Sequence, residues 1–168
     1  MFEQELLERT AKLIGNAKAR NFQFASAESC TGGMLGTLFT AVSGSSEVYE
    51  RGYITYSNLA KSEELEVPWE MLETYGAVSP QVAMAMAAGA VKKSSAHIAV
   101  SITGVAGPLG GTADKPVGLV YFGLAKEGSL TRNFEQDFGK IGREAIRLAA
   151  VKYAISLYER AIRADIES

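Results

Sequence analysis

Cysteine and histidine are almost absent from this sequence, which has one residue of each kind, Cys30 and His97. One cysteine cannot form a disulfide within the chain, and a zinc site made of cysteine and histidine ligands needs more of both. The chain also has no tight cluster of aspartate and glutamate residues of the type that binds magnesium. We therefore expect a fold without cross-links, and nothing in the sequence indicates a metal ion or another cofactor.

Long apolar runs and an excess of basic residues are missing as well. No stretch approaches the roughly 18 apolar residues of a bilayer-spanning helix, and the N-terminal segment MFEQELLERTAKL has neither the basic start nor the apolar core of a secretory signal. The chain has 17 lysines and arginines against 19 aspartates and glutamates, whereas nucleic-acid binding requires a cationic stripe. We expect a cytoplasmic protein that binds neither a membrane nor a nucleic acid.

The length and composition are those of one ordinary domain. The chain has 168 residues, of which 47% are hydrophobic and 21% are charged. A domain of this length buries roughly 70% of the surface of its unfolded chain, so its core is large enough to be stable. Because no linker, internal repeat or low-complexity segment interrupts the sequence, we expect a single domain over residues 1–168.

The first part of the chain predicts a helix, a strand and a second helix. Residues 1–20 place apolar side chains at helical spacing on one side, namely Leu7, Ala11, Ile14 and Ala17. The segment FQFASA predicts a strand that stops at Glu28, and the small-residue segment CTGGMLGTLFTAV predicts a helix from residue 30 onwards. Ser29 is therefore expected at a junction between a strand and a helix.

The rest of the chain continues this alternation and ends with a hairpin and a helix. Strands are predicted over residues 48–57, 96–104, 117–125 and 130–138, and helices over residues 58–66, 80–93 and about 143–162. Ser79 and Pro80 mark a helix start, with an N-cap serine and a proline in the first helical position. This order predicts a three-layer α/β/α sandwich with a mixed, mostly parallel sheet.

Polar or glycine-rich segments follow each of the first three predicted strands. They are Ser29 after the first strand, residues 56–61 after the second and residues 103–111 after the third. Ligands of open α/β sheets bind at the carboxyl ends of the strands. We therefore expect these three segments to form one site.

The segment SCTGG, residues 29–33, offers a nucleophile beside an open backbone. Gly32 and Gly33 would let a ligand approach the main chain closely, and free N–H groups there could bind an anion or an oxyanion. A small-residue helix packed closely on the sheet explains the same glycines. Spacing alone gives the two interpretations equal weight.

Ser29 needs a base, because a serine hydroxyl is a weak nucleophile at neutral pH. His97 is a poor candidate, since it lies at the predicted start of its strand, and the G-x-S-x-G elbow is missing. Lys61 can serve if burial lowers its pKa, although a solvated lysine is the more usual case. The thiolate of Cys30 is an alternative nucleophile, and a buried structural cysteine is the simpler interpretation of that residue.

Two further segments have the chemistry for binding a phosphate. Arg143 and Arg147 share a face at the start of the last helix and could clamp a phosphate, although solvated helix charges are commoner. The loop GVAGPLGG, residues 104–111, suits a polar ligand after a buried strand, but it matches neither the P-loop nor the G-x-G-x-x-G pattern. A generic tight loop is the alternative.

Several segments resemble, in order and spacing, those of the CinA C-terminal domain family. They are AESCTGG, SGSSEVYERGYITYSNLAK, YGAVS, SITGVAGPLGG, KPVG and REAIR, and the resemblance extends from the first helix to about Ile162. The best-understood members are nicotinamide-mononucleotide deamidases, which produce nicotinic acid mononucleotide and ammonia without a metal. The resemblance therefore implies an amidohydrolase domain over residues 1–168.

The resemblance also implies roles for individual residues. It implies Ser29 as the nucleophile, Lys61 as its base and Tyr56 as the group that orients or shares the proton. The substrate-binding residues that it implies are Cys30, Thr31, Gly32, Gly33, Thr103, Gly104, Gly107, Arg143 and Arg147.

Three positions depart from the family pattern. The chain reads FGKIGREAIR where members often have F-x-G-[DN]-R, Leu109 stands where a polar residue is common, and Glu66 stands where a glycine is expected. A non-catalytic pyridine-nucleotide-binding or regulatory module on the same fold is the alternative function, which the altered segment before Arg143 favours. Homo-oligomers are common for an enzyme of this size, so we also expect a homodimer.

Overall fold

The computed structural model describes residues 1–167, with side chains for residues 1–164. The helices are α1 (Gln4–Ala19), α2 (Met34–Thr40), α3 (Asn58–Leu65), α4 (Trp69–Tyr75), α5 (Pro80–Lys92) and α6 (Arg143–Glu167), with a 3-10 turn at Ser45–Glu47. The strands are β1 (Phe24–Glu28), β2 (Tyr49–Ile54), β3 (Ile98–Gly104), β4 (Leu119–Lys126) and β5 (Arg132–Asp137). Among the described residues, none of the helices is long and apolar enough to cross a membrane.

The strands form one mixed sheet in the order β2-β1-β3-β4-β5. β1 pairs in parallel with both β2 and β3, while β4 runs antiparallel to β3 and β5 antiparallel to β4. The register places Glu28 beside Ile54 on one side and Ile102 on the other, so three parallel strands end at nearly the same level. The predicted fold class is therefore confirmed, and the segments that follow these strands meet at one edge.

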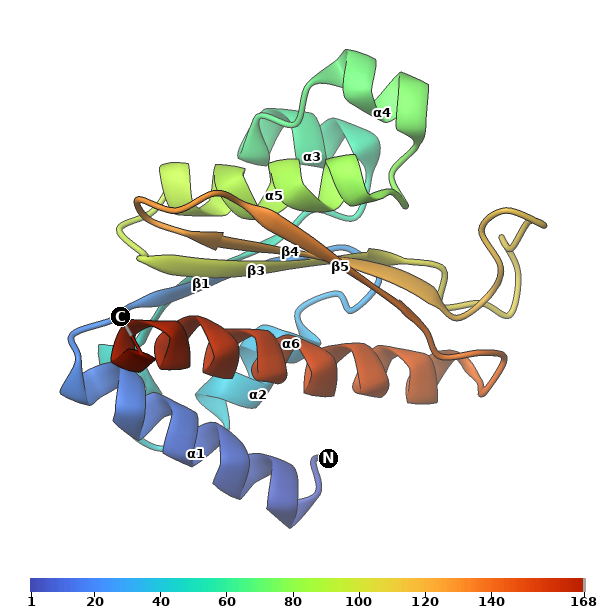
Figure 1. The fold of residues 1–168 in the computed structure, drawn as a ribbon. Coiled ribbons are helices and arrows are strands. Elements are labelled where there is room, and N and C mark those ends of the chain that lie inside the picture. The colour runs from blue at the N-terminus through green and yellow to red at the C-terminus, as the bar shows by residue number, and fades with distance from the viewer. Residues whose placement is uncertain (168) are drawn as a thin grey trace.

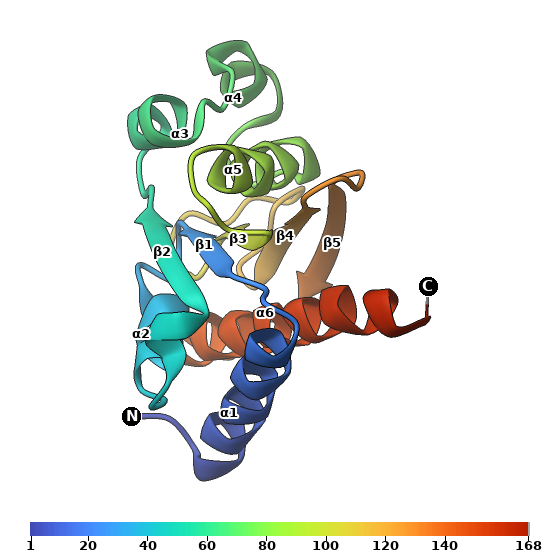
Figure 2. The same cartoon turned by 90° about the vertical axis from the view of Figure 1, so that its left-hand side faces the viewer.

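Helices cover both faces of the sheet, as Figure 1 shows, with α3, α4 and α5 on one face and α1, α2 and α6 on the other. Figure 2, turned by 90°, shows the same three layers. The rings of Phe24, Phe39 and Tyr158 pack together against the face covered by α6, with centroids 4.6 to 5.8 Å apart. β3 lies at the centre and is buried along its length except at Gly104, as its continuous apolar sequence predicts.

The predicted start of α5 is confirmed in its details. Ser79 is the N-cap, and its hydroxyl accepts a hydrogen bond of 3.3 Å from the N–H of Val82, while Pro80 occupies the first helical turn. Further along the helix, Gly89 lies against the end of α3, where an added Cβ would stand 2.1 Å from the carbonyl oxygen of Leu65. The small residues of α5 thus set how closely α3 approaches the sheet.

Two sequence predictions about the first helices were wrong in part, although Ile14 and Ala17 are buried as predicted. In α1, Ala11 is exposed and Leu7 only partly buried, and the buried face is formed by Leu6, Thr10, Leu13, Ile14 and Ala17. Helix α2 begins at Met34 and not at residue 30, because Gly32 and Gly33 have φ angles of 54° and 99°, which interrupt a helix. Residues 29–33 therefore form a turn, which we call the serine turn.

Glu66 ends α3 in the left-handed conformation, with a φ of 57°. Glycine is the usual residue in this position because it has no Cβ to clash with the backbone. The carboxylate of Glu66 forms ion pairs with Lys92 and Lys93 at the end of α5, at 2.5 and 3.0 Å. The left-handed conformation is less favourable for a glutamate than for a glycine, which the family pattern has here.

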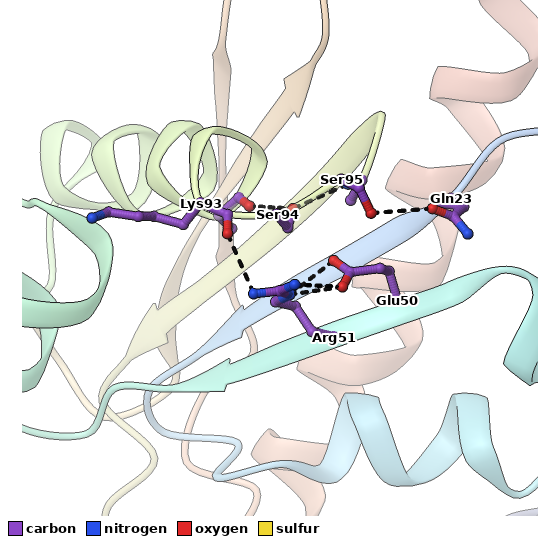
Figure 3. Close-up of polar contacts among 8 residues, drawn as sticks. Gln23, Glu50, Arg51, Lys93, Ser94 and Ser95 are labelled. Carbon is purple, nitrogen blue, oxygen red and sulfur yellow. Dashed lines mark hydrogen bonds and ion pairs between the residues drawn. The ribbon is translucent and has the colours of Figure 1, made fainter.

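The edge strand β2 is tied to the end of α5 by polar contacts (Figure 3). Arg51 forms an ion pair with Glu50 and donates a long hydrogen bond of 3.4 Å to the carbonyl of Lys93. Nearby, the hydroxyl of Ser95 lies 3.4 Å from the side-chain oxygen of Gln23. These surface contacts lie near the amino end of β3. They are therefore at the opposite end of the parallel strands from Ser29 and Lys61.

Two glycine-to-alanine variants test the packing of α5 on α3. We expect Gly89→Ala to lower the free energy of unfolding by about 1–3 kcal/mol, because the new methyl group overlaps the Leu65 carbonyl. Gly15→Ala, at an exposed helical position with nothing within 4 Å of the added Cβ, should raise it by about 0.5–1 kcal/mol. Urea unfolding measures both, and a Gly89→Ala protein as stable as the Gly15→Ala protein would contradict this packing.

Candidate active site

Ser29 stands directly after β1, between the ends of the two neighbouring strands. Its N–H donates a hydrogen bond of 2.9 Å to the carbonyl of Ile102 on β3. On the other side, the N–H of Thr55 donates to the carbonyl of Glu28 at 2.9 Å. Parallel pairing on both sides therefore fixes the backbone from which the Ser29 side chain projects, and this side chain is largely buried.

The serine turn leaves main-chain donors unused beside Ser29. Within the turn, the N–H of Gly32 bonds to the carbonyl of Ser29 at 3.1 Å, and the N–H of Met34 bonds to the carbonyl of Thr31 at 3.0 Å. Among the backbone hydrogen bonds of the described residues, none uses the N–H of Cys30 or Thr31. The turn thus has two N–H groups without a backbone acceptor beside Ser29.

A buried carboxylate, Glu28, holds the serine turn in place. Its side chain accepts hydrogen bonds from the hydroxyl of Thr31 at 2.7 Å and from the N–H groups of Leu35 and Gly36 at 2.9 and 3.2 Å. Glu28 is only 1% exposed, and these three donors make the burial of its carboxylate tolerable. Sequence reasoning missed this residue, although a glutamate at the end of the apolar segment FASAE was an available signal.

Lys61 extends from α3 into the protein and reaches Ser29. The helix begins at the N-cap Ser57, whose hydroxyl accepts a hydrogen bond of 3.0 Å from the N–H of Ala60. The ammonium nitrogen Nζ of Lys61 lies 3.0 Å from Ser29 Oγ, 2.8 Å from the carbonyl oxygen of Thr55 and 3.0 Å from that of Tyr56. With 1% exposure, Lys61 is a buried cation with three oxygen partners.

Burial lowers the pKa of Lys61 to about 8. The loss of hydration disfavours the charged form, and no carboxylate is close enough to restore it. When Nζ is neutral, its two hydrogens can serve the two carbonyl oxygens, and its lone pair then faces the hydroxyl of Ser29. This arrangement equips Lys61 to accept the proton of Ser29.

Tyr56 contacts Lys61 through its backbone and not through its hydroxyl. The side chain is 64% exposed, and its hydroxyl accepts a long hydrogen bond of 3.4 Å from Nη2 of Arg143. The carbonyl of Tyr56 is one of the three oxygen partners of Lys61. A role of its hydroxyl in proton transfer stays a prediction.

A pocket of about 300 Å³ opens over Ser29 and Lys61. Its lining includes the predicted site residues Ser29, Cys30, Tyr56, Lys61, Thr103, Gly104, Gly107 and Arg143. Thr103 is fixed by a hydrogen bond of 2.8 Å from its hydroxyl to the carbonyl of Ala77. We call this cavity the Ser29 pocket, and it lies at the carboxyl ends of the strands, as the sequence predicted.

The two arginines of α6 lie on different sides of the serine turn. Arg143 lines the Ser29 pocket and donates a hydrogen bond of 2.8 Å to the carbonyl of Gly107. Arg147 donates to the carbonyls of Cys30 and Thr31 at 3.0 and 3.1 Å. Together with Gly32 and Gly33, Arg147 lines a separate hollow, so substrate contacts of these three residues stay predictions.

Cys30 lines the Ser29 pocket but has an unreactive thiol, and His97 lies away from the pocket. Burial raises the pKa of the Cys30 thiol to about 11, so the thiolate is scarce at neutral pH. His97 stands just before β3, at the far end of the strand from the site, where its Nδ1 accepts a hydrogen bond of 2.9 Å from the N–H of Gln23. Ser29 and Lys61 are therefore the reactive pair that the geometry supports.

These features define a class of protein. It is a three-layer α/β/α domain with a serine and a buried lysine at the carboxyl ends of its strands. The sequence model of the CinA C-terminal domain matches residues 6–162, and the chain belongs to this family. The resemblance seen in the sequence motifs is thereby confirmed.

Individual relatives agree with this assignment. The nicotinamide-nucleotide amidohydrolase PncC of Enterobacter agglomerans is 43% identical over 155 residues, which cover 92% of this chain and 94% of that protein. A CinA-like protein of Syntrophomonas wolfei is also 43% identical, but the match covers 95% of this chain and only 43% of the longer relative. A crystal structure of the competence/damage inducible protein CihA from Agrobacterium tumefaciens is 41% identical, with a TM-score of 0.93 over 97% of this chain and 98% of that one.

The hydrogen bonds of Glu28 can be tested by Glu28→Gln. We expect a loss of about 2 kcal/mol in the free energy of unfolding, because the amide group of glutamine brings N–H donors to a place where three donors already converge. Glu127→Gln, on the exposed turn after β4, is the matched control and should change the stability by less than about 0.5 kcal/mol. Equal urea midpoints for the two variants would show that Glu28 does not hold the turn.

Proposed function

We propose that this protein deamidates nicotinamide mononucleotide through a Ser29–Lys61 dyad, giving nicotinic acid mononucleotide and ammonia. The observation that carries the proposal is the 3.0 Å contact between Lys61 Nζ and Ser29 Oγ inside the Ser29 pocket. The names of the PncC relatives, which cover nearly the same length, support the substrate and the reaction.

The first step is the attack of Ser29 on the carboxamide carbon. Neutral Lys61 accepts the hydroxyl proton as Oγ forms the new C–O bond, and the carbonyl becomes an oxyanion. The unused N–H groups of Cys30 and Thr31 are the donors that we assign to this oxyanion. The cationic pyridinium ring of the substrate disfavours a second positive charge nearby, which helps to keep Lys61 neutral.

The second step releases ammonia and the acid product. The ammonium form of Lys61 gives its proton to the leaving amide nitrogen as the C–N bond breaks, which leaves an ester between Ser29 and the nicotinoyl group. A water molecule then attacks this ester, Lys61 takes up the proton of the water, and Ser29 recovers its proton when the ester bond breaks. The same two residues thus serve both halves of the reaction.

The Ser29 pocket supplies the remaining parts that we propose. Thr103, Gly104 and Gly107 form the wall against which the nucleotide lies, and Arg143 contacts its polar end. Arg147 acts on the substrate indirectly, because its bonds to the carbonyls of Cys30 and Thr31 hold the serine turn with the N–H groups of these residues free.

Ammonia release from nicotinamide mononucleotide tests the dyad. We expect turnover by the parent protein and a loss of about a thousandfold or more in both Ser29→Ala and Lys61→Met, because each removes a group that acts in the chemical step. Cys30→Ala should keep most of the activity, since the thiol has no part in the mechanism. Circular dichroism shows whether each variant is folded. Activity in a folded Ser29→Ala protein, or its loss in a folded Cys30→Ala protein, would refute the assignment.

The dependence of kcat/KM on pH tests the state of Lys61. Only the neutral amine is a base, so kcat/KM should rise about tenfold per pH unit below pH 8 and level off above the pKa of about 8. The profile is recorded between pH 6 and 9.5 with nicotinamide mononucleotide and limiting enzyme. A flat profile over this range would contradict Lys61 as the general base.

A further inference from the structure

We propose that a second hollow, next to the Ser29 pocket, binds a phosphate monoester and that Lys140 supplies a charge that recognises it. This loop hollow has a volume of about 600 Å³ and is lined by the loop after β3, by Lys140 and by Arg143. The inference rests on the proposed function, and it adds a subsite and a specificity residue to it.

The loop hollow adjoins the Ser29 pocket. Ala106, Leu109, Gly110 and Arg143 line both cavities. The hollow beside Arg147, by contrast, shares no lining residue with the Ser29 pocket. A ligand whose reacting carbon lies at Ser29 can therefore extend past Leu109 and Gly110 into the loop hollow.

The sizes of the two cavities favour such an extension. The Ser29 pocket alone, at about 300 Å³, is at the lower limit for pockets that enclose a small-molecule ligand. A pyridine ring with its carboxamide occupies the part next to Ser29 and Lys61, and the sugar and phosphate of a mononucleotide need further room. The loop hollow provides this room on the side where Arg143 stands.

The charges around the loop hollow favour an anion. Lys140 and Arg143 are its charged lining residues, and neither aspartate nor glutamate lines it. Lys140 is exposed and, among the described residues, makes no hydrogen bond or ion pair. The hollow beside Arg147 is less suited, because Glu144 also lines it.

Lys140 belongs to the segment FGKIGR, which departs from the family pattern before Arg143. In that pattern an acidic or amide residue precedes the arginine, whereas here Gly142 does, and a cation stands three residues before Arg143. Two positive charges at one hollow attract a dianionic phosphate more strongly than one, and a lysine suits it as a mobile point charge.

The experiment compares nicotinamide mononucleotide with nicotinamide riboside, which has the same carboxamide and cationic ring but no phosphate. We expect Lys140→Gln to lower the ratio of kcat/KM for the nucleotide to that for the riboside by roughly five- to tenfold, and Lys140→Arg to restore most of it. Lys12→Gln, which removes the same charge from exposed α1, is the matched control and should keep the parent ratio.

Calorimetry on the Ser29→Ala background separates this inference from the proposed reaction. If Lys140→Gln weakens binding of the nucleotide several-fold more than binding of the riboside, the subsite is supported, even for a protein that releases no ammonia. If Lys140→Gln weakens both ligands equally, weakens neither, or matches Lys12→Gln, the phosphate does not lie at Lys140 and the inference is overturned. Failure of the proposed reaction alone would appear as binding without turnover in the parent protein.

Discussion

A lysine buried among three oxygen atoms is the constraint on which the rest of the site depends. Lys61 can stay 1% exposed only because Ser29 Oγ and the carbonyls of Thr55 and Tyr56 surround its Nζ. These partners come from the residues that follow β1 and β2. The parallel pairing of the two strands therefore brings together the oxygen atoms that bind Lys61 Nζ. The close approach of α3 to Gly89 of α5 brings the lysine to that place.

Glu28 is the counterpart of Lys61 on the other side of Ser29. The carboxylate accepts three hydrogen bonds from the serine turn and the start of α2, while the lysine nitrogen is held by three acceptors from the strand ends. Neither charge forms an ion pair with the other, because separate sets of partners satisfy them. Two hydrogen-bonded polar clusters thus fix the surroundings of Ser29, and a fixed geometry is what the proposed nucleophile needs to stay at reacting distance from its proposed base.

The parts of this structure that the sequence predicted are those with local signals. The serine and proline at the start of α5, the apolar run of β3 and the hairpin after β4 each depend on neighbouring residues, and the convergence of Ser29 and Lys61 followed from the rule for strand ends. The sequence predicted that α2 begins at residue 30, whereas it begins at Met34. The prediction failed because the positive φ angles of Gly32 and Gly33 depend on the tertiary contacts of the turn. The face of α1 was misassigned because Thr10 is buried with its hydroxyl bonded to the Leu6 carbonyl. The short α4 was missed, and the role of Glu28 depends on donors up to eight residues away.

The residues that we propose for the reaction and those that we propose for recognition lie in different kinds of structure in this domain. Ser29 and the carbonyl partners of Lys61 stand at buried strand ends, where a change in one residue leaves a charge or a donor without a partner. The residues around the loop hollow stand on an exposed loop and on the segment before α6, where Lys140 has no partner to lose among the described residues. If the loop hollow binds the substrate as we propose, substitutions there change what is bound without disturbing Ser29 and Lys61, so a shared fold and a shared pair of residues do not by themselves fix the substrate. The segment FGKIGR, which departs from the family pattern, belongs to this exposed part of the chain. Substitutions in such exposed segments affect the stability of the fold less than substitutions in the core.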